Sequence, residues 1–212
     1  MNRTTFLIDG FNLYHSLRTA ENELRDFSTR WLDLPDLLRS YLYTIGDSAE
    51  IGQIFYFSAL ATHLEKRKPG VTVRHRNYID CLRANGVIPV LGRFKPKEVY
   101  CGHCRKMSRR FEEKETDVAM SVKLMELFHL DAADTIVLVT GDTDLAPAVR
   151  TAMSLFARKR IWFLFPYKRK NKELAQISDG HCNIRKERYA RHQLPQTIRL
   201  SSGRIIGKPD QW

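Results

Sequence analysis

The sequence predicts an α/β fold with three layers, in which a central, mostly parallel sheet of five strands is covered by helices on both faces. Short apolar runs alternate along the chain with longer stretches of helical periodicity. Their spacing suits the crossover connections that join parallel strands. The chain has 212 residues, 43% of them hydrophobic, which is sufficient for one domain with a sizeable core.

Five apolar runs are the expected strands, and the segments between them are the expected helices. The strands lie at residues 5–9, 53–60, 87–94, 135–140 and 160–165. Leucines at helical spacing indicate helical segments on both sides of a polar stretch near residues 21–30. Further helices are expected at residues 72–85, 117–130 and 144–156. Gly86 is a suitable stop for the helix at 72–85.

We expect one domain over residues 1–180, with a short insertion near 95–112, and a C-terminal extension over 181–212 that packs on the domain or trails from it. No apolar run approaches the roughly 18 residues of a membrane helix. The N-terminus leads directly into a strand rather than into a signal sequence. The sequence therefore predicts a cytoplasmic protein with no membrane partner, either monomeric or a homo-oligomer.

The net charge of +11 indicates a polyanionic partner, and nucleic acid is the first candidate. The alternative is a basic enzyme whose lysines and arginines only maintain solubility. Basic clusters occur at residues 66–68, 74–76, 105–110, 158–160 and 168–170. The last of these follows the strand at 160–165, whereas the cluster at 158–160 enters that strand at its opposite end and is interpreted as a solvated face.

Acidic residues follow two of the expected strands. Asp9 ends the first strand and Asp142 follows the fourth. In open α/β sheets, ligands bind beyond the carboxyl ends of the strands, where the strand order reverses. If the first and fourth strands are neighbours, the two carboxylates share one crevice. A third acidic segment ends at Asp117, where the next helix begins.

Three segments together resemble the NYN domain family, relatives of the PIN-type nucleases, and within it the bacterial LabA-like branch. They are Leu-Ile-Asp-Gly-Phe-Asn at 7–12, Glu-Glu-Lys-Glu-Thr-Asp-Val at 112–118, and Leu-Val-Thr-Gly-Asp-Thr-Asp-Leu-Ala-Pro at 138–147. They occur in the family's order, and the resemblance covers residues 4–179. It implies a PIN-like fold and a metal-dependent nuclease acting on RNA, in which acidic residues hold Mg²⁺ or Mn²⁺.

Phosphodiester hydrolysis gives independent reason for such a site, because divalent cations both activate water and neutralise charge that develops at phosphorus. Mg²⁺ and Mn²⁺ prefer oxygen ligands. We assign Asp9, Asp117 and Asp142 as direct metal ligands. Asp144 is a candidate for a second metal ion, and the amide of Asn12 for orienting a water or contacting a phosphate.

Each of these residues also has an ordinary structural interpretation. Asp144 is a plausible helix N-cap, Asp9 and Asn12 are plausible turn or cap residues, and an acid such as Asp117 is favoured in the first turn of a helix. These roles explain the residues one at a time. They do not explain why all of them lie at one expected edge of the sheet.

Four basic residues are candidates for RNA binding. Lys168, Arg169 and Lys170 follow the fifth strand at the edge expected to hold Asp142, and Lys114 precedes Asp117 by three residues. Lys114 is equally compatible with a solvated lysine paired to a neighbouring glutamate. One difference from the family concerns Lys123, which stands where relatives often carry a further acid, and it weakens the case for a second metal ion.

Cys101 and Cys104 have the spacing of a zinc knuckle. A structural zinc site usually needs four protein ligands, and the sequence has no second close pair. Free thiols in a tight turn, a redox pair and a Zn²⁺ site therefore remain alternatives, and the resemblance adds that relatives can carry such a pair in the same insertion.

The leading interpretation is a Mg²⁺- or Mn²⁺-dependent endoribonuclease. The alternative is a regulatory module that binds RNA with little catalysis, which Lys123 would allow. A phosphatase of the haloacid-dehalogenase type is disfavoured because Phe11 stands where its second aspartate is needed. A nucleotide cofactor is not expected, since no Gly-x-Gly-x-x-Gly follows the first strand.

Overall fold

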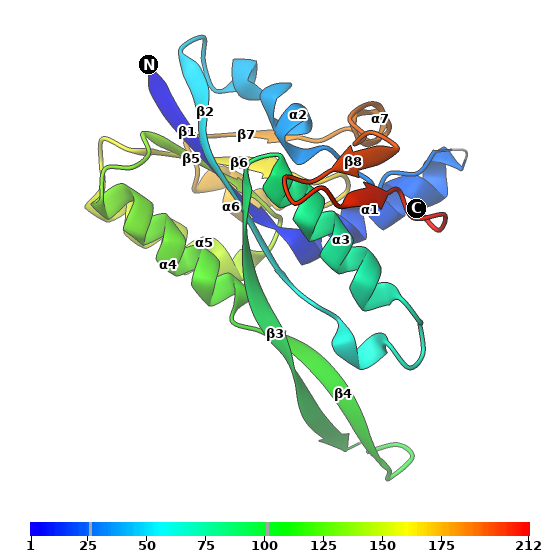
Figure 1. Cartoon of the computed structure of the whole chain (residues 1–212). Coiled ribbons are helices and arrows are strands. Elements are labelled where there is room, and N and C mark those ends of the chain that lie inside the picture. The colour runs from blue at the N-terminus through cyan, green and yellow to red at the C-terminus, as the bar shows by residue number, and fades with distance from the viewer. Residues whose placement is uncertain (26, 101) are drawn as a thin grey trace.

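The computed structural model describes residues 1–25, 27–100 and 102–212 and has a seven-stranded central sheet (Figure 1). Its strands are β1 (Asn2–Asp9), β2 (Ala49–Ala59), β3 (Val87–Tyr100), β4 (Met107–Lys114), β5 (Thr135–Val139), β6 (Arg160–Phe165) and β7 (Gly180–Asn183). They lie in the order β4-β3-β2-β1-β5-β6-β7, and every neighbouring pair is parallel except β3 and β4. The α/β class and the mostly parallel sheet are confirmed.

Helices cover both faces of the sheet. One face packs against α1 (Gly10–Leu24), α2 (Leu34–Arg39), α3 (Val71–Ala84) and α7 (Lys186–Arg191). The other packs against α4 (Thr116–His129), α5 (Ala146–Leu155) and α6 (Lys172–Gln176). Three 3₁₀ turns also occur, η1 (Leu42–Thr44), η2 (Thr62–Leu64) and η3 (Thr143–Leu145). No helix in the described ranges is both long and apolar enough to cross a bilayer.

Side-chain alternation along β1 supplies both cores. Phe6 and Ile8 belong to the core under α1 and α3, whereas Leu7 belongs to the core under α4 and α5. All three side chains are fully buried. A central parallel strand covered on both faces is expected to be buried at successive positions rather than at alternate ones, and β5 and most of β1 follow this rule.

The prediction of five strands was wrong, because β4 and β7 were not anticipated. β4 carries mostly charged and polar side chains, and it is largely exposed because it lies at the edge of the sheet, paired with β3. β7 is a four-residue edge strand with no apolar run. Neither strand is covered on both faces, so neither has the apolar pattern that identified the other five.

β3 and β4 form an arm that projects beyond the sheet (Figure 1). Residues 87–92 of β3 pair with β2, and residues 93–100 pair with β4. The chain returns to the sheet at Lys114, which packs closely against Gly92 of β3. A Cβ atom added to that glycine would be only 2.7 Å from the carbonyl oxygen of Lys114. The arm therefore delivers the beginning of α4 to the carboxyl ends of the strands.

The C-terminal residues pack on the α1 and α3 side. β8 (Thr197–Arg199) and β9 (Ile205–Gly207) form a small antiparallel hairpin. The ring of Trp212 lies 5.6 Å from that of Tyr78 and 6.1 Å from that of the fully buried Trp31. This end of the chain therefore extends the core over α3.

Candidate metal centre

The strand order reverses at the pair β1 and β5, which makes their carboxyl ends the switch point of the sheet. The two strands are in register as parallel neighbours, with Leu7 beside Leu138 and Ile8 beside Val139. Asp9 is the last residue of β1, and Asp142 lies three residues after β5. The neighbouring strands that the sequence analysis required for a shared crevice are present.

Asp9 is buried and held by hydrogen bonds. Its Oδ1 accepts the backbone N–H groups of Phe11 at 3.0 Å and Asn12 at 2.9 Å, so it caps the N-terminus of α1. Its Oδ2 accepts the hydroxyl of Thr140 at 2.8 Å. Burial raises the pKa of Asp9, while the hydrogen bonds from Asn12 and Thr140 act in the opposite direction.

The loop that carries Asp142 is fixed to the same hydrogen-bond network. The hydroxyl of Thr140 accepts the Asp142 N–H at 3.1 Å, and Asp142 Oδ1 accepts the Asp144 N–H at 3.0 Å. The carboxamide oxygen of Asn12 accepts the Gly141 N–H at 3.2 Å. A Cβ at Gly141 would collide with the carbonyl oxygen of Arg169, so glycine allows the two loops to approach.

Asp117 reaches the site from the first turn of α4, which covers the opposite face of the sheet from α1. Asp9, Asp117 and Asp142 each offer a carboxylate oxygen, and these oxygens lie within 4.8 Å of one another. Burial, together with the charges of Asp9 and Asp142, raises the pKa of Asp117 to about 6. We call these three residues the acidic triad.

The donor set of the acidic triad fits a hard divalent cation. Carboxylate oxygens at this separation suit Mg²⁺ or Mn²⁺, and the group found among the described residues consists of carboxylates alone. A cation here would compensate the mutual repulsion that raises the pKa of Asp117. Asp144, by contrast, is exposed and lies outside this group of three.

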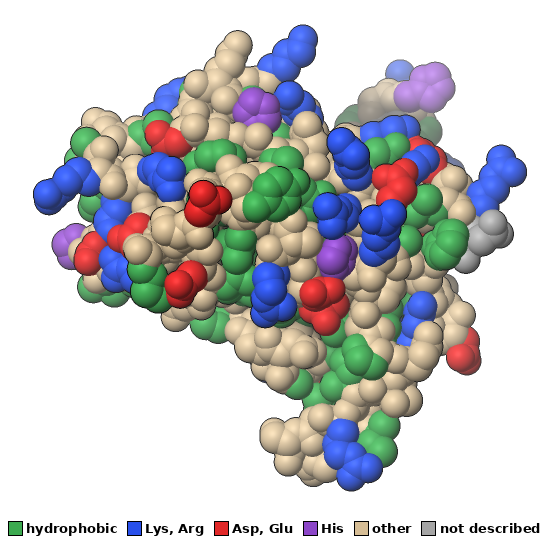
Figure 2. Space-filling model, turned by 90° about the horizontal axis from the view of Figure 1, so that it is seen from above, with side chains coloured by type: hydrophobic (Ala, Val, Ile, Leu, Met, Phe, Trp, Pro, Cys, Tyr) green, Lys and Arg blue, Asp and Glu red, His purple; other side chains and the backbone are tan. Residues whose placement is uncertain are grey.

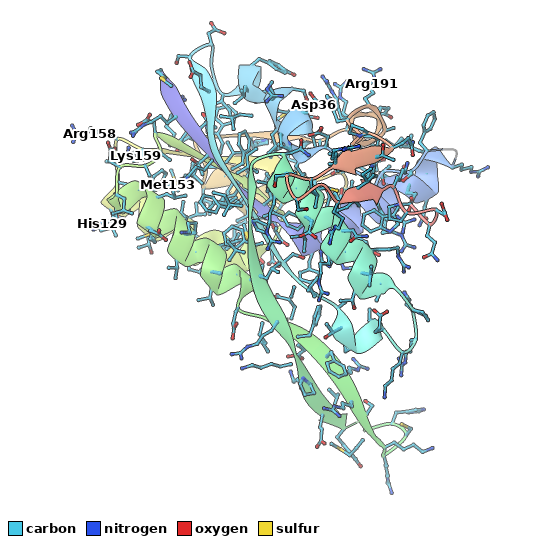
Figure 3. The ribbon with its side chains drawn as sticks, viewed as in Figure 1. Asp36, His129, Met153, Arg158, Lys159 and Arg191 are labelled. Atoms are coloured by element: carbon cyan, nitrogen blue, oxygen red, sulfur yellow. The ribbon has the colours of Figure 1, made fainter. Side chains whose placement is uncertain are left out.

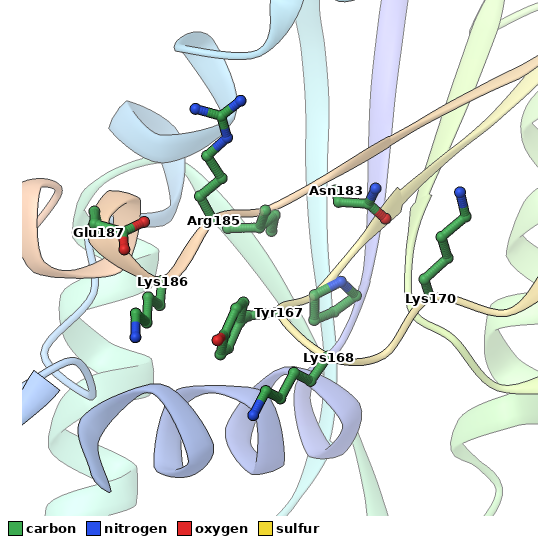
Figure 4. A pocket seen from close by; sticks show the side chains of 9 residues that line it. Tyr167, Lys168, Lys170, Asn183, Arg185, Lys186 and Glu187 are labelled. Atoms are coloured by element: carbon green, nitrogen blue, oxygen red, sulfur yellow. The ribbon is translucent and has the colours of Figure 1, made fainter. Parts of the chain in front are cut away.

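A pocket of about 340 Å³ lies at the ends of β6 and β7 (Figure 4). Two of the four basic candidates, Lys168 and Lys170, line it, and Arg169 lies between them in the chain. Lys168, Lys170, Arg185 and Lys186 contribute to its lining, and we call it the basic pocket. Lys168 and Lys186 bind Glu23 on α1 at 2.6 and 3.1 Å. Arg169 does not line the pocket; its backbone packs on Gly141.

Lys114 lies at the end of β4, where its ammonium group is 3.0 Å from a carboxylate oxygen of Glu112. Lys123 binds Glu126 at 2.6 Å and lies 5.2 Å from the ring centroid of Phe55. The lysine that departs from the family's pattern is therefore paired with a carboxylate outside the acidic triad.

Positive charge alone does not locate a binding face. Lys and Arg side chains are spread over the face seen in Figure 2, interrupted by acidic ones, rather than collected in one patch. Arg158 and Lys159 lie near His129 at the end of α4 far from the arm (Figure 3). Arg158 is exposed, as expected of a solvated face. Lys159 differs from that interpretation, because its side chain is only 14% exposed and binds Asp134 at 3.3 Å.

The proposed zinc pair cannot be placed, because Cys101 lies outside the described residues. Cys104 is exposed. The sequence analysis also missed Thr140, whose single hydroxyl joins Asp9 to the loop of Asp142. A threonine that ends an apolar strand directly before Gly-Asp is the only signal that pointed to it.

A family model described as the NYN domain matches residues 3–184. Among curated proteins, none matches the chain. A crystal structure of a protein of unknown function from Vibrio parahaemolyticus is similar over 87% of this chain and 93% of that chain, with 18% identity and a TM-score of 0.57. This likeness concerns the fold.

Two longer proteins resemble the chain more weakly. MurG of Acinetobacter baumannii has 8% identity and a TM-score of 0.36, over 85% of this chain and 41% of that one. A UDP-bound MnaA from S. aureus has 13% identity and a TM-score of 0.39, over 91% of this chain and 41% of that one. Neither similarity is strong enough to support an argument about this protein.

Proposed function

Because the chain belongs to the NYN domain family, we propose that it is a Mg²⁺- or Mn²⁺-dependent endoribonuclease acting at the acidic triad. The observation that carries this proposal is the convergence of Asp9, Asp117 and Asp142 from three separate elements, with their oxygens within 4.8 Å. When bound, the cation would polarise the phosphate oxygens and lower the pKa of an attacking water.

The residues of the chain would prepare this site before substrate arrives. Thr140 and the N-terminus of α1 fix both oxygens of Asp9, so its carboxylate cannot rotate freely. Asn12 ties the loop of Asp142 to α1, which keeps the separation between the two acids constant. Asp144 stands at the solvent-exposed rim, where it would order water or a second cation.

RNA would be held mainly through its phosphates. Around the basic pocket, Lys168 and Lys186 point toward α1 and Lys170 lies beside Asn183 (Figure 4). Arg169 lies in the same loop, against Gly141 of the triad's own loop. Contacts of this kind provide affinity without reading the base sequence. Lys114, at the end of β4, would contact the phosphate that is cut.

A regulatory RNA-binding module with little catalysis is the competing function. It would use the same basic residues and would not need the carboxylates to bind a cation. The sequence feature that allows it is Lys123, which pairs with Glu126 and stands where relatives often carry a further acid. The convergence of the three carboxylates favours cleavage instead.

The decisive test is cleavage of labelled single-stranded and structured RNA in EDTA, Mg²⁺ and Mn²⁺, with wild-type protein and Asp142→Asn. We expect cleavage only with a divalent cation, and none with the variant. Asp47→Asn is the matched control, because Asp47 is an exposed acid in the turn that precedes β2, at the opposite edge of the sheet. Binding without cleavage under every metal condition would establish the regulatory module instead.

A further inference from the structure

A second concave site lies beside the acidic triad, on the side of the sheet covered by α1 and α3. It is a cleft of about 320 Å³, and Gly10 and Phe11, which directly follow Asp9, form part of its lining. Its volume is within the roughly 300–1,000 Å³ typical of small-molecule sites. We call it the aromatic cleft.

Aromatic rings from three elements form its outer wall, and a ring from a fourth element stacks on one of them. Phe11 of α1 meets Phe94 of β3 edge to face, with ring centroids 5.5 Å apart. The ring of His63 in η2 lies 4.5 Å from that of Phe94. On its other side, His63 stacks on Phe111 of β4 at 4.4 Å, with the planes only 13° apart. The stack therefore leads from the triad to the arm.

The cleft also contains polar atoms suited to a planar ligand. Within the described residues, Nδ1 of His63 is buried and has no hydrogen-bond partner. Nε2 of His75 is 3.4 Å from the hydroxyl of Ser58, which is a long contact. Burial lowers the pKa of His63 and lowers that of His75 to about 4. Both rings are therefore neutral at pH 7, and each can present one donor and one acceptor.

A nucleobase fits this combination better than a phosphate does. Its faces would stack on aromatic rings, as bases of single strands do in proteins that bind them. Its edge would hydrogen-bond to Nε2 of His75, whose contact with the Ser58 hydroxyl is long. The basic pocket beyond the triad is the better site for phosphates, because its lining includes four cationic side chains.

We propose that the aromatic cleft binds one unpaired base of the RNA strand next to the phosphate held at the acidic triad, with Phe94 as the stacking surface. This proposal rests on the proposed ribonuclease function. A base can enter only after leaving its duplex, so the enzyme is selective for single-stranded RNA at the cut. The arm, through Phe111, continues the stacking surface away from the site.

The test uses short single-stranded RNAs in which one 2-aminopurine is moved position by position across the cleavage site. They are mixed with the Asp142→Asn variant, and fluorescence reports stacking. We expect strong quenching at one position. An abasic nucleotide there should weaken binding by roughly 5- to 150-fold, the range that corresponds to loss of one base–aromatic stack. Adding Phe94→Leu should remove the quenching and make binding insensitive to the abasic nucleotide.

Two further variants guard this result. His63→Asn tests the same cleft without changing Phe94, in case the leucine variant does not fold. Tyr43→Ala removes an exposed aromatic ring that precedes β2, at the other edge of the sheet, and should change nothing. Equal quenching at every position, or an equal loss with Tyr43→Ala, would overturn the cleft proposal while metal-dependent cleavage stands. Absence of both RNA binding and cleavage would overturn the proposed function as well.

Discussion

The two concave regions on either side of the acidic triad have nearly the same volume, about 340 Å³ for the basic pocket and 320 Å³ for the aromatic cleft. Both lie at the carboxyl ends of parallel strands. The basic pocket is lined by lysines and an arginine, with Glu23 bound to two of the lysines. The aromatic cleft is lined mainly by aromatic rings and by histidines, of which burial keeps His63 and His75 neutral. Arg30 and Arg74 also contribute to its lining.

The comparison indicates that the two regions bind different parts of the RNA, the basic pocket its phosphates and the aromatic cleft a base. Charged groups attract phosphates at a distance, and this attraction weakens with salt. Rings act only at contact, and stacking on them carries little salt dependence of its own. Both regions lie at the same edge of the sheet, where the strands end. The side chains around each region therefore decide whether it binds the phosphate or the base of a nucleotide.

The largest effect is expected from a change that leaves both regions intact. Asp117→Asn should lower the cleavage rate by more than about 100-fold, beyond the roughly 10–100-fold usual for residues that support metal ligands. RNA affinity should stay within a few-fold of wild type, because neither pocket is altered. Cleavage rates and filter binding measure the two quantities separately, and a parallel fall in both would contradict the division.

The same variant has a pH-dependent effect on stability in EDTA. The pKa of Asp117 rises from 3.8 to about 6 in the folded protein, so the folded state holds more protons than the unfolded one between these values. Stability of the metal-free wild type should therefore fall as pH increases from about 4 to 6, and Asp117→Asn should escape this loss. Thermal unfolding across that range would show a widening difference in Tm, and a constant difference would refute it.

A smaller effect is expected from Thr140→Val, which keeps the shape of the side chain and removes its hydroxyl. Asp9 would lose one hydrogen bond and the Asp142 N–H another. We expect a loss of roughly 10- to 100-fold in activity or in metal affinity. Thr151→Val in α5 is the control, because that hydroxyl bonds only within its own helix. Full activity in the Thr140 variant would show that the network does not position the acids.

One variant in each region tests directly whether the basic pocket acts through charge and the aromatic cleft through stacking. Lys170→Ala should weaken RNA binding a few-fold at low salt and reduce the salt slope by about 0.7, the contribution of one phosphate contact on a single strand. Phe94→Leu should weaken binding without changing that slope. Titrations at several salt concentrations measure both, and a change of slope with Phe94→Leu would mean that the cleft acts through charge.

The smallest effect is expected far from both regions. Arg158→Ala removes one positive charge beside β6, at the end of α4 remote from the arm (Figure 3). RNA affinity and cleavage should remain within about twofold of wild type, because an exposed charge far from the bound strand is screened. A loss equal to that of Lys170→Ala would place the RNA on a different face.

The sequence was informative wherever burial and strand ends decide the structure. Five strands were predicted because each contains an apolar run, and helices bury β1, β5 and most of β6 on both faces of the sheet. Asp9 and Asp142 were assigned to one edge from their places after two of those strands. β4 and β7 are edge strands without an apolar run, so the sequence did not indicate them. Asp117 was recognised as the end of a third acidic segment, but its spacing shows no more than a helix start, and the family resemblance supported its role as a ligand.

Local chemistry along the chain therefore determined the fold class, the acidic residues and the basic character of the protein, because each depends on residue type and short-range periodicity. Tertiary structure alone decided that α4 brings Asp117 across the sheet to Asp9, and that Phe11, His63 and Phe94 form one wall. These contacts join segments separated by dozens of residues. They form because β1, β2 and β3 are neighbours in the sheet and because the β3–β4 arm returns the chain to it.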